Sequence, residues 1–133
     1  MAETPAATIR AAAEAYVAGD GDRLFQQLDD AVHVLGSEQF ENWLGMDETR
    51  QGMAAELRRL KPEGPGSVGG GLVDLALQPN APDIHQTDDV AWWSATSDLT
   101  LDGRYYRETS WTTVLRRDHK DWKIVHSHFS IHR

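Results

Sequence analysis

Residues 90–131, with the sequence VAWWSATSDLTLDGRYYRETSWTTVLRRDHKDWKIVHSHFSI, decide the fold of this chain. Three runs within this stretch, at 90–101, 104–117 and 122–131, are rich in valine, isoleucine, threonine and aromatic residues, which favour strands. Asp102-Gly103 separates the first two runs and residues 118–121 separate the last two, and both separators are typical hairpin turns. We therefore expect three consecutive antiparallel strands.

Helices are predicted upstream of these strands. Thr4 and Pro5 form a helix N-cap followed by a proline in the first turn, and apolar residues then recur on one face as far as Gly19. A short second helix, capped by Asp20 or Asp22, is expected to end near residues 29–30.

A short strand is predicted over residues 31–35, followed by a third helix that Asp47 caps and Pro62 ends. Residues 62–71 contain five glycines and two prolines, which predicts a mobile loop, and a further strand is expected over 73–78. Helices segregated from a run of hairpin-linked strands indicate an α+β fold in which the helices cover one face of an antiparallel sheet.

Length and composition limit the function classes. The chain has 133 residues and no cysteine, which predicts one domain over 1–133 whose hydrophobic core needs neither disulfides nor a cofactor. Its formal charge of -8 makes nucleic acid and anionic membrane surfaces unlikely partners by electrostatic repulsion. Neither an apolar run of about 20 residues nor a signal peptide is evident, so we expect a cytoplasmic protein.

Two-residue turns predict the register of the strands, and the register predicts the faces of the sheet. Asp98 should then lie opposite Arg107, and Trp93 opposite Thr112. In the second hairpin, Thr113 should oppose His126 and Trp111 should oppose His128, unless a one-residue slip exchanges the faces of the last strand.

One of the two resulting side-chain sets is more apolar and is expected to face the helices. It contains Trp93, Ala95, Ser97, Leu99, Tyr106, Glu108, Ser110, Thr112, Val114, Val125, Ser127, Phe129 and Ile131. The outer set contains Trp92, Ser94, Thr96, Asp98, Arg107, Thr109, Trp111, Thr113, Leu115, Ile124, His126 and His128.

Within the outer set, Trp92, Trp111, His126 and His128 form an amphipathic patch of residue types that interfaces enrich, which favours a homodimer through this face. His126 and His128 also have the spacing of two zinc ligands on one strand face, but a third ligand is missing, so no metal site is expected.

The helix-facing set offers a candidate pocket. Its expected lining residues are Tyr16, Trp43, Trp93, Tyr106, Ser110, Thr112 and Ser127. Glu108 is the candidate general acid or base there, because burial would raise the pKa of its carboxyl, although it could instead reach water or an arginine on a helix. His33 alternates with two valines, so its face stays open.

Four stretches carry a family resemblance that covers essentially the whole chain: residues 15–20 (AYVAGD), 36–45, 89–92 (DVAW) and the closing 122–130 (WKIVHSHFS). Together they resemble the SnoaL-like domains of the nuclear transport factor 2-like superfamily, which has a ketosteroid isomerase-like cone fold. The ending is also similar to the association domain of calcium/calmodulin-dependent protein kinase II. The resemblance implies a cone-shaped, strongly curved antiparallel sheet around three N-terminal helices, a pocket in its wide end and a dimer through its outer face.

The superfamily contains isomerases, cyclases, dehydratases and non-catalytic domains, so the site must decide the function. The resemblance places the catalytic aspartate of ketosteroid isomerases at residues 35–37, their tyrosine near Ala12 and a further acid near Thr112, and none of these groups is present. For the acid and histidine of SnoaL-type cyclases, Glu108 and His33 are the only candidate catalytic pair.

Two functions remain as predictions. The first is binding of a small, largely apolar ring compound, with possible cofactor-free proton transfer of the isomerase, cyclase or dehydratase type. The second is a non-catalytic association or ligand-sensing domain that acts through homo-oligomerisation.

Overall fold

The structure is a computed structural model that describes residues 4–36, 42–59, 84–101 and 104–132. Its elements in chain order are α1 (Pro5–Ala18), α2 (Gly21–Gln26), β1 (Leu28–Leu35), β2 (Asn42–Leu44), α3 (Gly45–Arg59), β3 (His85–Thr87), β4 (Val90–Leu101), β5 (Arg104–Asp118) and β6 (Asp121–His132). The predicted loop over 62–71 and the predicted strand over 73–78 lie outside the described residues. None of the described helices is long and apolar enough to cross a membrane.

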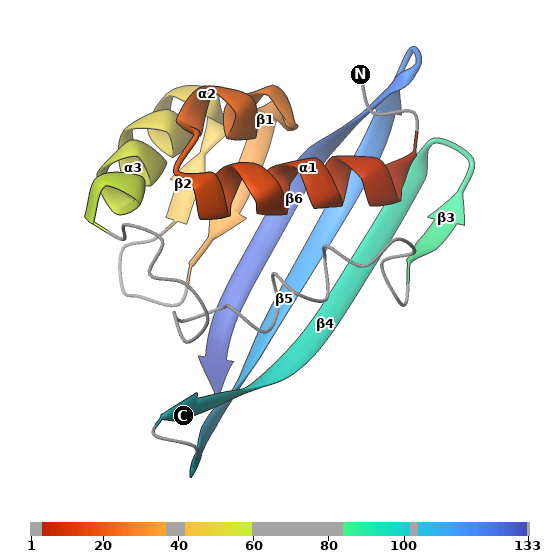
Figure 1. Cartoon of the computed structure of the whole chain (residues 1–133). Helices are drawn as coiled ribbons and strands as arrows, with labels where there is room; N and C mark the ends of the chain where they lie inside the picture. Colours follow the sequence, from red (N-terminus) through yellow and green to blue (C-terminus); the bar gives the residue numbers. More distant parts are fainter. Residues whose placement is uncertain (1–3, 37–41, 60–83, 102–103, 133) are drawn as a thin grey trace.

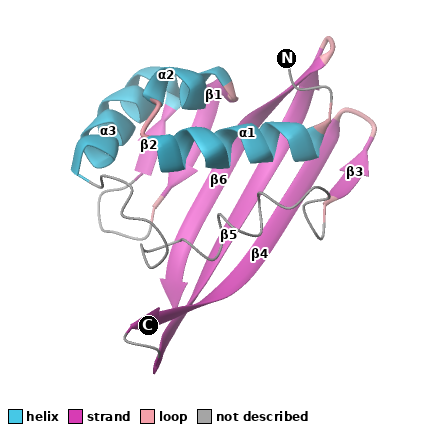
Figure 2. Cartoon of the chain, in the orientation of Figure 1, coloured by secondary structure: helices cyan, strands magenta, loops and turns pink. Residues whose placement is uncertain are grey.

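The helices lie on one side of a curved, open sheet of six strands, which confirms the predicted α+β class (Figures 1 and 2). The strand order is β2-β1-β6-β5-β4-β3. The described strands pair antiparallel, as predicted, except that β1 runs parallel to β6. Residues 36–120 separate these two strands, so no hairpin constrains their relative direction.

Helix α1 forms where the sequence predicts it. The Thr4 hydroxyl accepts a hydrogen bond from the Ala7 N–H at 3.1 Å, and Gly19 ends the helix in the left-handed region with φ of 69°. The buried face is made of Ile9 and small alanines, so the helix can approach the sheet closely. The Thr8 hydroxyl, fully buried, donates to the Trp122 carbonyl at 2.9 Å and ties α1 to β6.

Helix α2 is shorter than predicted and β1 is longer. Asp20 caps α2 by accepting from the Arg23 N–H at 3.1 Å, but the helix ends at Gln26. Leu28, expected in the helix, pairs instead with Ile124 of β6, and the Ile124 N–H donates to the Gln27 carbonyl at 2.8 Å. A partner more than ninety residues away in sequence therefore decides where the helix stops.

Helix α3 begins at Gly45, two residues before the predicted cap Asp47. Gly45 has φ of 84°, which a residue with a Cβ adopts only with strain. Gly52 lies in the helix interior, and a Cβ there would overlap the indole ring of Trp43. The glycine therefore lets α3 pack directly on the β2 tryptophan.

The β4–β5 hairpin starts in the predicted register and then departs from it. Leu101 pairs with Arg104, as expected for the two-residue turn, but the pairing shifts by one residue between Leu99 and Thr100. Tyr106 is the extra residue of this β-bulge. The predicted pairs are wrong as a result: Trp93 lies opposite Thr113, and Asp98 lies opposite Glu108.

A second bulge interrupts the β5–β6 pairing at Val125. Leu115 pairs with Ile124 in the predicted register, but from Val114 onward each residue of β5 pairs one position further along β6. Thr113 therefore opposes Ser127 rather than His126, and Trp111 opposes Phe129 rather than His128.

The bulge at Tyr106 exchanges the predicted faces of β5, and the bulge at Val125 returns the rest of β6 to its predicted side. Trp111, Thr113 and Leu115 share the side of buried Trp93, whereas Glu108, Ser110, Thr112 and Val114 lie on the other side of the sheet. On β6, Ser127 and Phe129 keep their predicted side, and Ile124, predicted on the outer face, is buried beneath the helices.

Candidate functional site

Five residues form a row across the helix-facing side of the sheet, here called the inner row. Trp43 pairs with Val34, Val34 with Ser127, Ser127 with Thr113, and Thr113 with Trp93, each directly across neighbouring strands. Directly paired residues point to the same side of a sheet. The row therefore joins β2, β1, β6, β5 and β4 on one face.

An aromatic pair fixes one end of the inner row. The Trp93 side chain is fully buried, and its ring meets that of Trp111 edge to face, with centroids 5.1 Å apart and an interplanar angle of 89°. The Trp111 Nε1 donates to the Ser127 hydroxyl at 2.8 Å. Both indoles are thus held in fixed orientations.

Two buried polar atoms in the inner row lack a hydrogen-bond partner among the described residues. They are the Nε1 of Trp93 and the hydroxyl of Thr113, which lie on directly paired residues. A buried polar group without a partner costs about 1–3 kcal/mol. A ligand oxygen could accept from the indole N–H, and the threonine hydroxyl could donate or accept.

The predicted pocket residues divide between the two sides of the sheet. Trp43, Trp93 and Ser127 belong to the inner row, and Tyr16 of α1 packs, half-buried, against the same core. Ser110 and Thr112 lie on the opposite face, where the hydroxyls of Ser110 and Ser130 share a 2.7 Å hydrogen bond. Tyr106 is the bulge residue of β5.

Glu108 does not face the helices. It pairs with Asp98 of β4 and His132 of β6 on the outer side, and its side chain is exposed. The predicted placement is wrong because it assumed a regular hairpin, and the bulge at Tyr106 turns every residue beyond it to the other face.

His33 also lies on the outer side. It pairs directly with His126 of β6, the two rings meet with centroids 5.3 Å apart, and its Nε2 lies 2.7 Å from the Asn42 side-chain oxygen. The proposed catalytic pair of Glu108 and His33 is therefore on the face opposite the inner row.

Three of the four predicted interface residues share this outer face. Trp92 pairs with Val114 and Val114 with His126, while His128 pairs with Thr112. Trp111 is the exception, because it belongs to the helix-facing side. Trp92 is 42% exposed and stacks on His85, with ring centroids 5.6 Å apart.

The imidazoles influence one another on this face. Partial burial, together with the neighbouring His33 and His128, lowers the pKa of His126 below its usual value, so that the neutral ring is favoured. In the part of the chain that the structure describes, no three histidine, aspartate or glutamate side chains gather as a metal site would require.

A family model matches the sequence over almost its whole length. Residues 6–133 match the model of the SnoaL-like domain. The chain belongs to the SnoaL-like domain family. No curated protein sequence matches it significantly.

Solved structures share the fold of this SnoaL-like domain. A candidate calcium/calmodulin-dependent protein kinase type II association domain from Thiobacillus denitrificans superposes with a TM-score of 0.69 at 16% identity, covering 98% of this chain and 96% of that one. A candidate ketosteroid isomerase from Parabacteroides distasonis gives a TM-score of 0.67 at 17% identity, with 98% and 90% covered.

A third solved structure is also similar in fold to this SnoaL-like domain. A nuclear transport factor 2-like protein with a cystatin-like fold from Novosphingobium aromaticivorans gives a TM-score of 0.62 at 14% identity, with 93% of this chain and 77% of that one covered. At such identities the likeness concerns the fold alone.

Sequence reasoning missed Thr113 and Trp111 as members of the helix-facing side of this SnoaL-like domain. One sign was present in the pattern: the regular register places the apolar Trp111, Leu115 and Ile124 together on the outer face. Leu115 and Ile124 are almost fully buried in the structure. Apolar residues on a predicted solvent face can therefore reveal a register shift.

Proposed function

We propose that this SnoaL-like domain binds a small, largely apolar ring compound against the inner row. The observation that carries the proposal concerns two buried polar atoms on directly opposed residues, Trp93 Nε1 and Thr113 Oγ1, which have no hydrogen-bond partner among the described residues. Buried polar groups are normally hydrogen-bonded, and a ligand is one way to complete them. Small-molecule sites combine apolar and aromatic walls with a few such polar groups.

The chemistry of the neighbouring side chains supports this class of ligand. Trp43, Trp93 and Trp111 place flat apolar rings on this side of the sheet, and the Ser127 hydroxyl already accepts a hydrogen bond from Trp111. A ligand carbonyl or hydroxyl oxygen would accept from the indole N–H of Trp93. Glu108 and His33 lie across the sheet, so the proposed function is binding and assigns proton transfer to neither residue.

The test compares 2-naphthol, which carries a hydroxyl, with naphthalene, and follows binding by tryptophan fluorescence. Thr113→Val removes the inner hydroxyl with little change of shape, and Thr112→Val is the matched control on the exposed outer side. Thr113→Val should weaken 2-naphthol binding at least fivefold and leave naphthalene binding unchanged. The proposal fails if neither probe binds saturably, or if the two variants affect 2-naphthol equally.

A specific observation favours a second function, self-association through the outer face. Trp92 is exposed although it is a large aromatic residue, and its row continues through Val114, His126 and His33 without a carboxylate, lysine or arginine. Two copies that each carry a net charge of -8 repel least where their surfaces are uncharged. We propose a two-fold homodimer through this row.

Sedimentation at micromolar concentration tests the dimer. Trp92→Asp should give a monomer, whereas Val17→Asp, which charges an equally exposed apolar residue on α1, should leave the dimer intact. A wild-type monomer, or equal dissociation by both variants, would remove this proposal.

A further inference from the structure

A recess lies apart from the inner row and from the outer row of Trp92, Val114, His126 and His33, and it shares no residue with either. It opens between α2, the start of β1, α3 and the start of β6, and its volume is about 510 Å³. Its lining residues are Asp22, Phe25, Gln26, Leu28, Asp29, Asp30, Met46, Arg50, Asp118 and Lys123. This volume falls in the range of about 300–1,000 Å³ that is typical of small-molecule sites.

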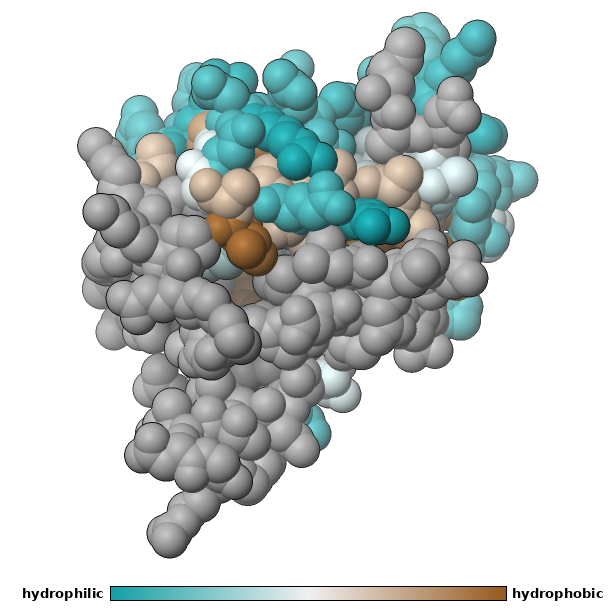
Figure 3. All heavy atoms as spheres, in the orientation of Figure 1, coloured by the Kyte–Doolittle hydropathy of each residue, from teal (hydrophilic) through white to brown (hydrophobic). Residues whose placement is uncertain are grey.

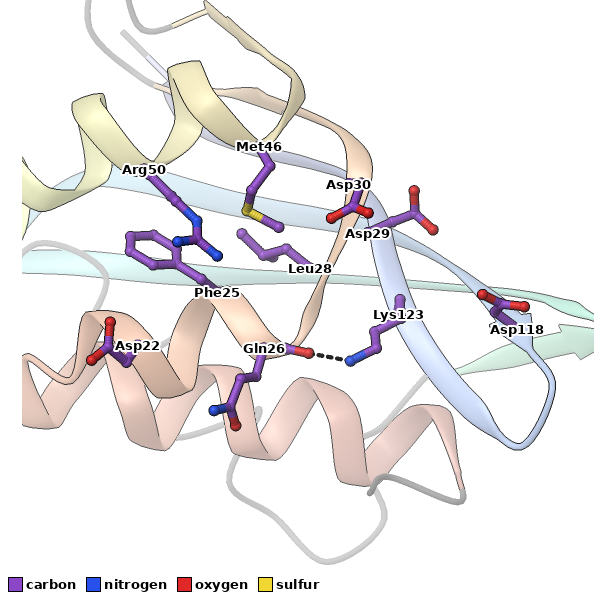
Figure 4. Close-up of a pocket in the computed structure, with 10 residues that line it drawn as sticks. All are labelled: Asp22, Phe25, Gln26, Leu28, Asp29, Asp30, Met46, Arg50, Asp118 and Lys123. Carbon is purple, nitrogen blue, oxygen red and sulfur yellow. Dashed lines mark hydrogen bonds between the residues drawn. The ribbon is translucent and has the colours of Figure 1, made fainter.

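The middle of the recess is apolar. Phe25 and Leu28 are each 8% exposed, and Met46 is partly buried against the same core. Figure 4 shows Met46 and Leu28 lying between Arg50 on one side and Asp30 on the other. The opposite charges are thus separated by an apolar floor.

Arg50 presents an available guanidinium. Its Cζ lies 5.4 Å from the centre of the Phe25 ring, and no carboxylate is within ion-pair distance of it among the described residues. Stacking on a ring holds the planar guanidinium in place and leaves its edge free to donate. Such an edge fits a carboxylate through two parallel hydrogen bonds.

The other charged groups of the recess differ in whether they already have a hydrogen-bond or ion-pair partner. Asp29 accepts from the Ala31 N–H and from Arg116, each at 2.9 Å, and Lys123 donates to the Gln26 carbonyl. Asp30 is exposed and has no ion-pair partner in the described part of the chain. Asp22 is likewise exposed and has no ion-pair partner there, but Figure 4 places Asp30, beyond Met46 and Leu28, across the apolar floor from Arg50.

The charged residues that line the recess indicate which class of ligand it can bind. Four aspartates, one arginine and one lysine line the recess, so a simple anion meets net repulsion. A simple cation would leave the guanidinium of Arg50 without a partner and adjacent to a like charge. Both charges are matched only by a compound that carries both signs.

We propose that this recess binds a small amphoteric compound, whose carboxylate pairs with Arg50, whose ammonium pairs with Asp30 and whose flat apolar body lies on Phe25, Leu28 and Met46. The proposal is independent of the function proposed for the inner row, because the two sites share no residue.

Calorimetric titration with 4-(aminomethyl)benzoate tests the proposal, with benzoate and benzylamine as probes that each lack one charge. The amphoteric probe should bind saturably and at least tenfold more tightly than either single-charge probe. Arg50→Gln and Asp30→Asn should each weaken its binding at least tenfold.

Two variants of the same charge change serve as controls. Arg10→Gln changes a residue on α1. Asp88→Asn changes a residue in the β3–β4 turn, where Asp88 has a positive φ that asparagine also tolerates. Both should leave binding unchanged, as should Thr113→Val. The proposal is overturned if the amphoteric probe does not saturate, if a single-charge probe binds as tightly, or if a control variant weakens binding as much as Arg50→Gln.

Discussion

Thr113 of β5 lies directly opposite Trp93 of β4, and both residues bury a polar atom that has no partner among the described residues. Figure 3 shows teal hydrophilic residues together with pale and brown apolar ones over the helices, whereas these two residues are fully buried. Two polar atoms, Trp93 Nε1 and Thr113 Oγ1, are therefore buried next to the hydrophobic core on the helix-facing side of the sheet.

Replacing Thr113 should stabilise the ligand-free protein. Thr113→Val removes an unpartnered hydroxyl and keeps the shape of the side chain, so we expect the free energy of unfolding to rise by about 1 kcal/mol. Urea denaturation measures this change, with the exposed Thr112→Val as control. A loss of stability in Thr113→Val would mean that the hydroxyl is hydrogen-bonded in solution.

Gly52→Ala should destabilise the domain, although alanine normally favours a helix over glycine by about 1 kcal/mol. The added Cβ would overlap the indole of Trp43, and overpacking of this kind costs about 1–3 kcal/mol. Thermal unfolding should show the loss. Combining Gly52→Ala with Trp43→Leu should recover part of it, and an absence of recovery would assign the effect elsewhere.

Thr8→Val should cost about 1–2 kcal/mol of stability, because it leaves the buried carbonyl of Trp122 without its hydrogen bond from α1. The exposed Thr96→Val on β4 should change stability by less than about 0.5 kcal/mol. Chemical denaturation of both variants provides the comparison, and equal effects would contradict the role of this bond.

Acidification should reduce stability through His126. Its folded-state pKa is lowered by burial and by His33 and His128, so below about pH 6.5 the unfolded chain binds protons more readily than the folded one. The stabilising contribution is present above that pH and is lost as the pH falls toward the lowered value.

Charged residues on the outer face with His126 include Asp29, Arg116 and Lys123 toward the α2 end, and the paired Glu108 and Asp98 toward the other end. His126→Gln should flatten the loss of stability between pH 7 and 5, measured by unfolding at each pH. The control His119→Gln replaces a histidine whose side chain is 94% exposed and should leave the slope unchanged.

Local sequence patterns determined most of the elements. Thr4, Pro5 and Gly19 mark the ends of α1 through contacts within one turn, and Leu101 pairs with Arg104 as the Asp-Gly pattern in the sequence predicts. Such elements are predictable because the interactions that define them lie within a few residues of one another. The closing residues 122–130 likewise carried the family resemblance that the match over 6–133 confirms.

The tertiary structure decided which side chains meet in the candidate site. The bulge at Tyr106 turned Thr113 and Trp111 toward the helices and Glu108 away, and the bulge at Val125 brought Ser127 opposite Thr113. No turn residue in the sequence marks either bulge. A bulge is favoured by the bend it gives a strand, and that bend matters only once long strands must curve beneath helices. The parallel pairing of His33 with His126 depends in the same way on contacts between segments far apart in the chain, which local patterns do not encode.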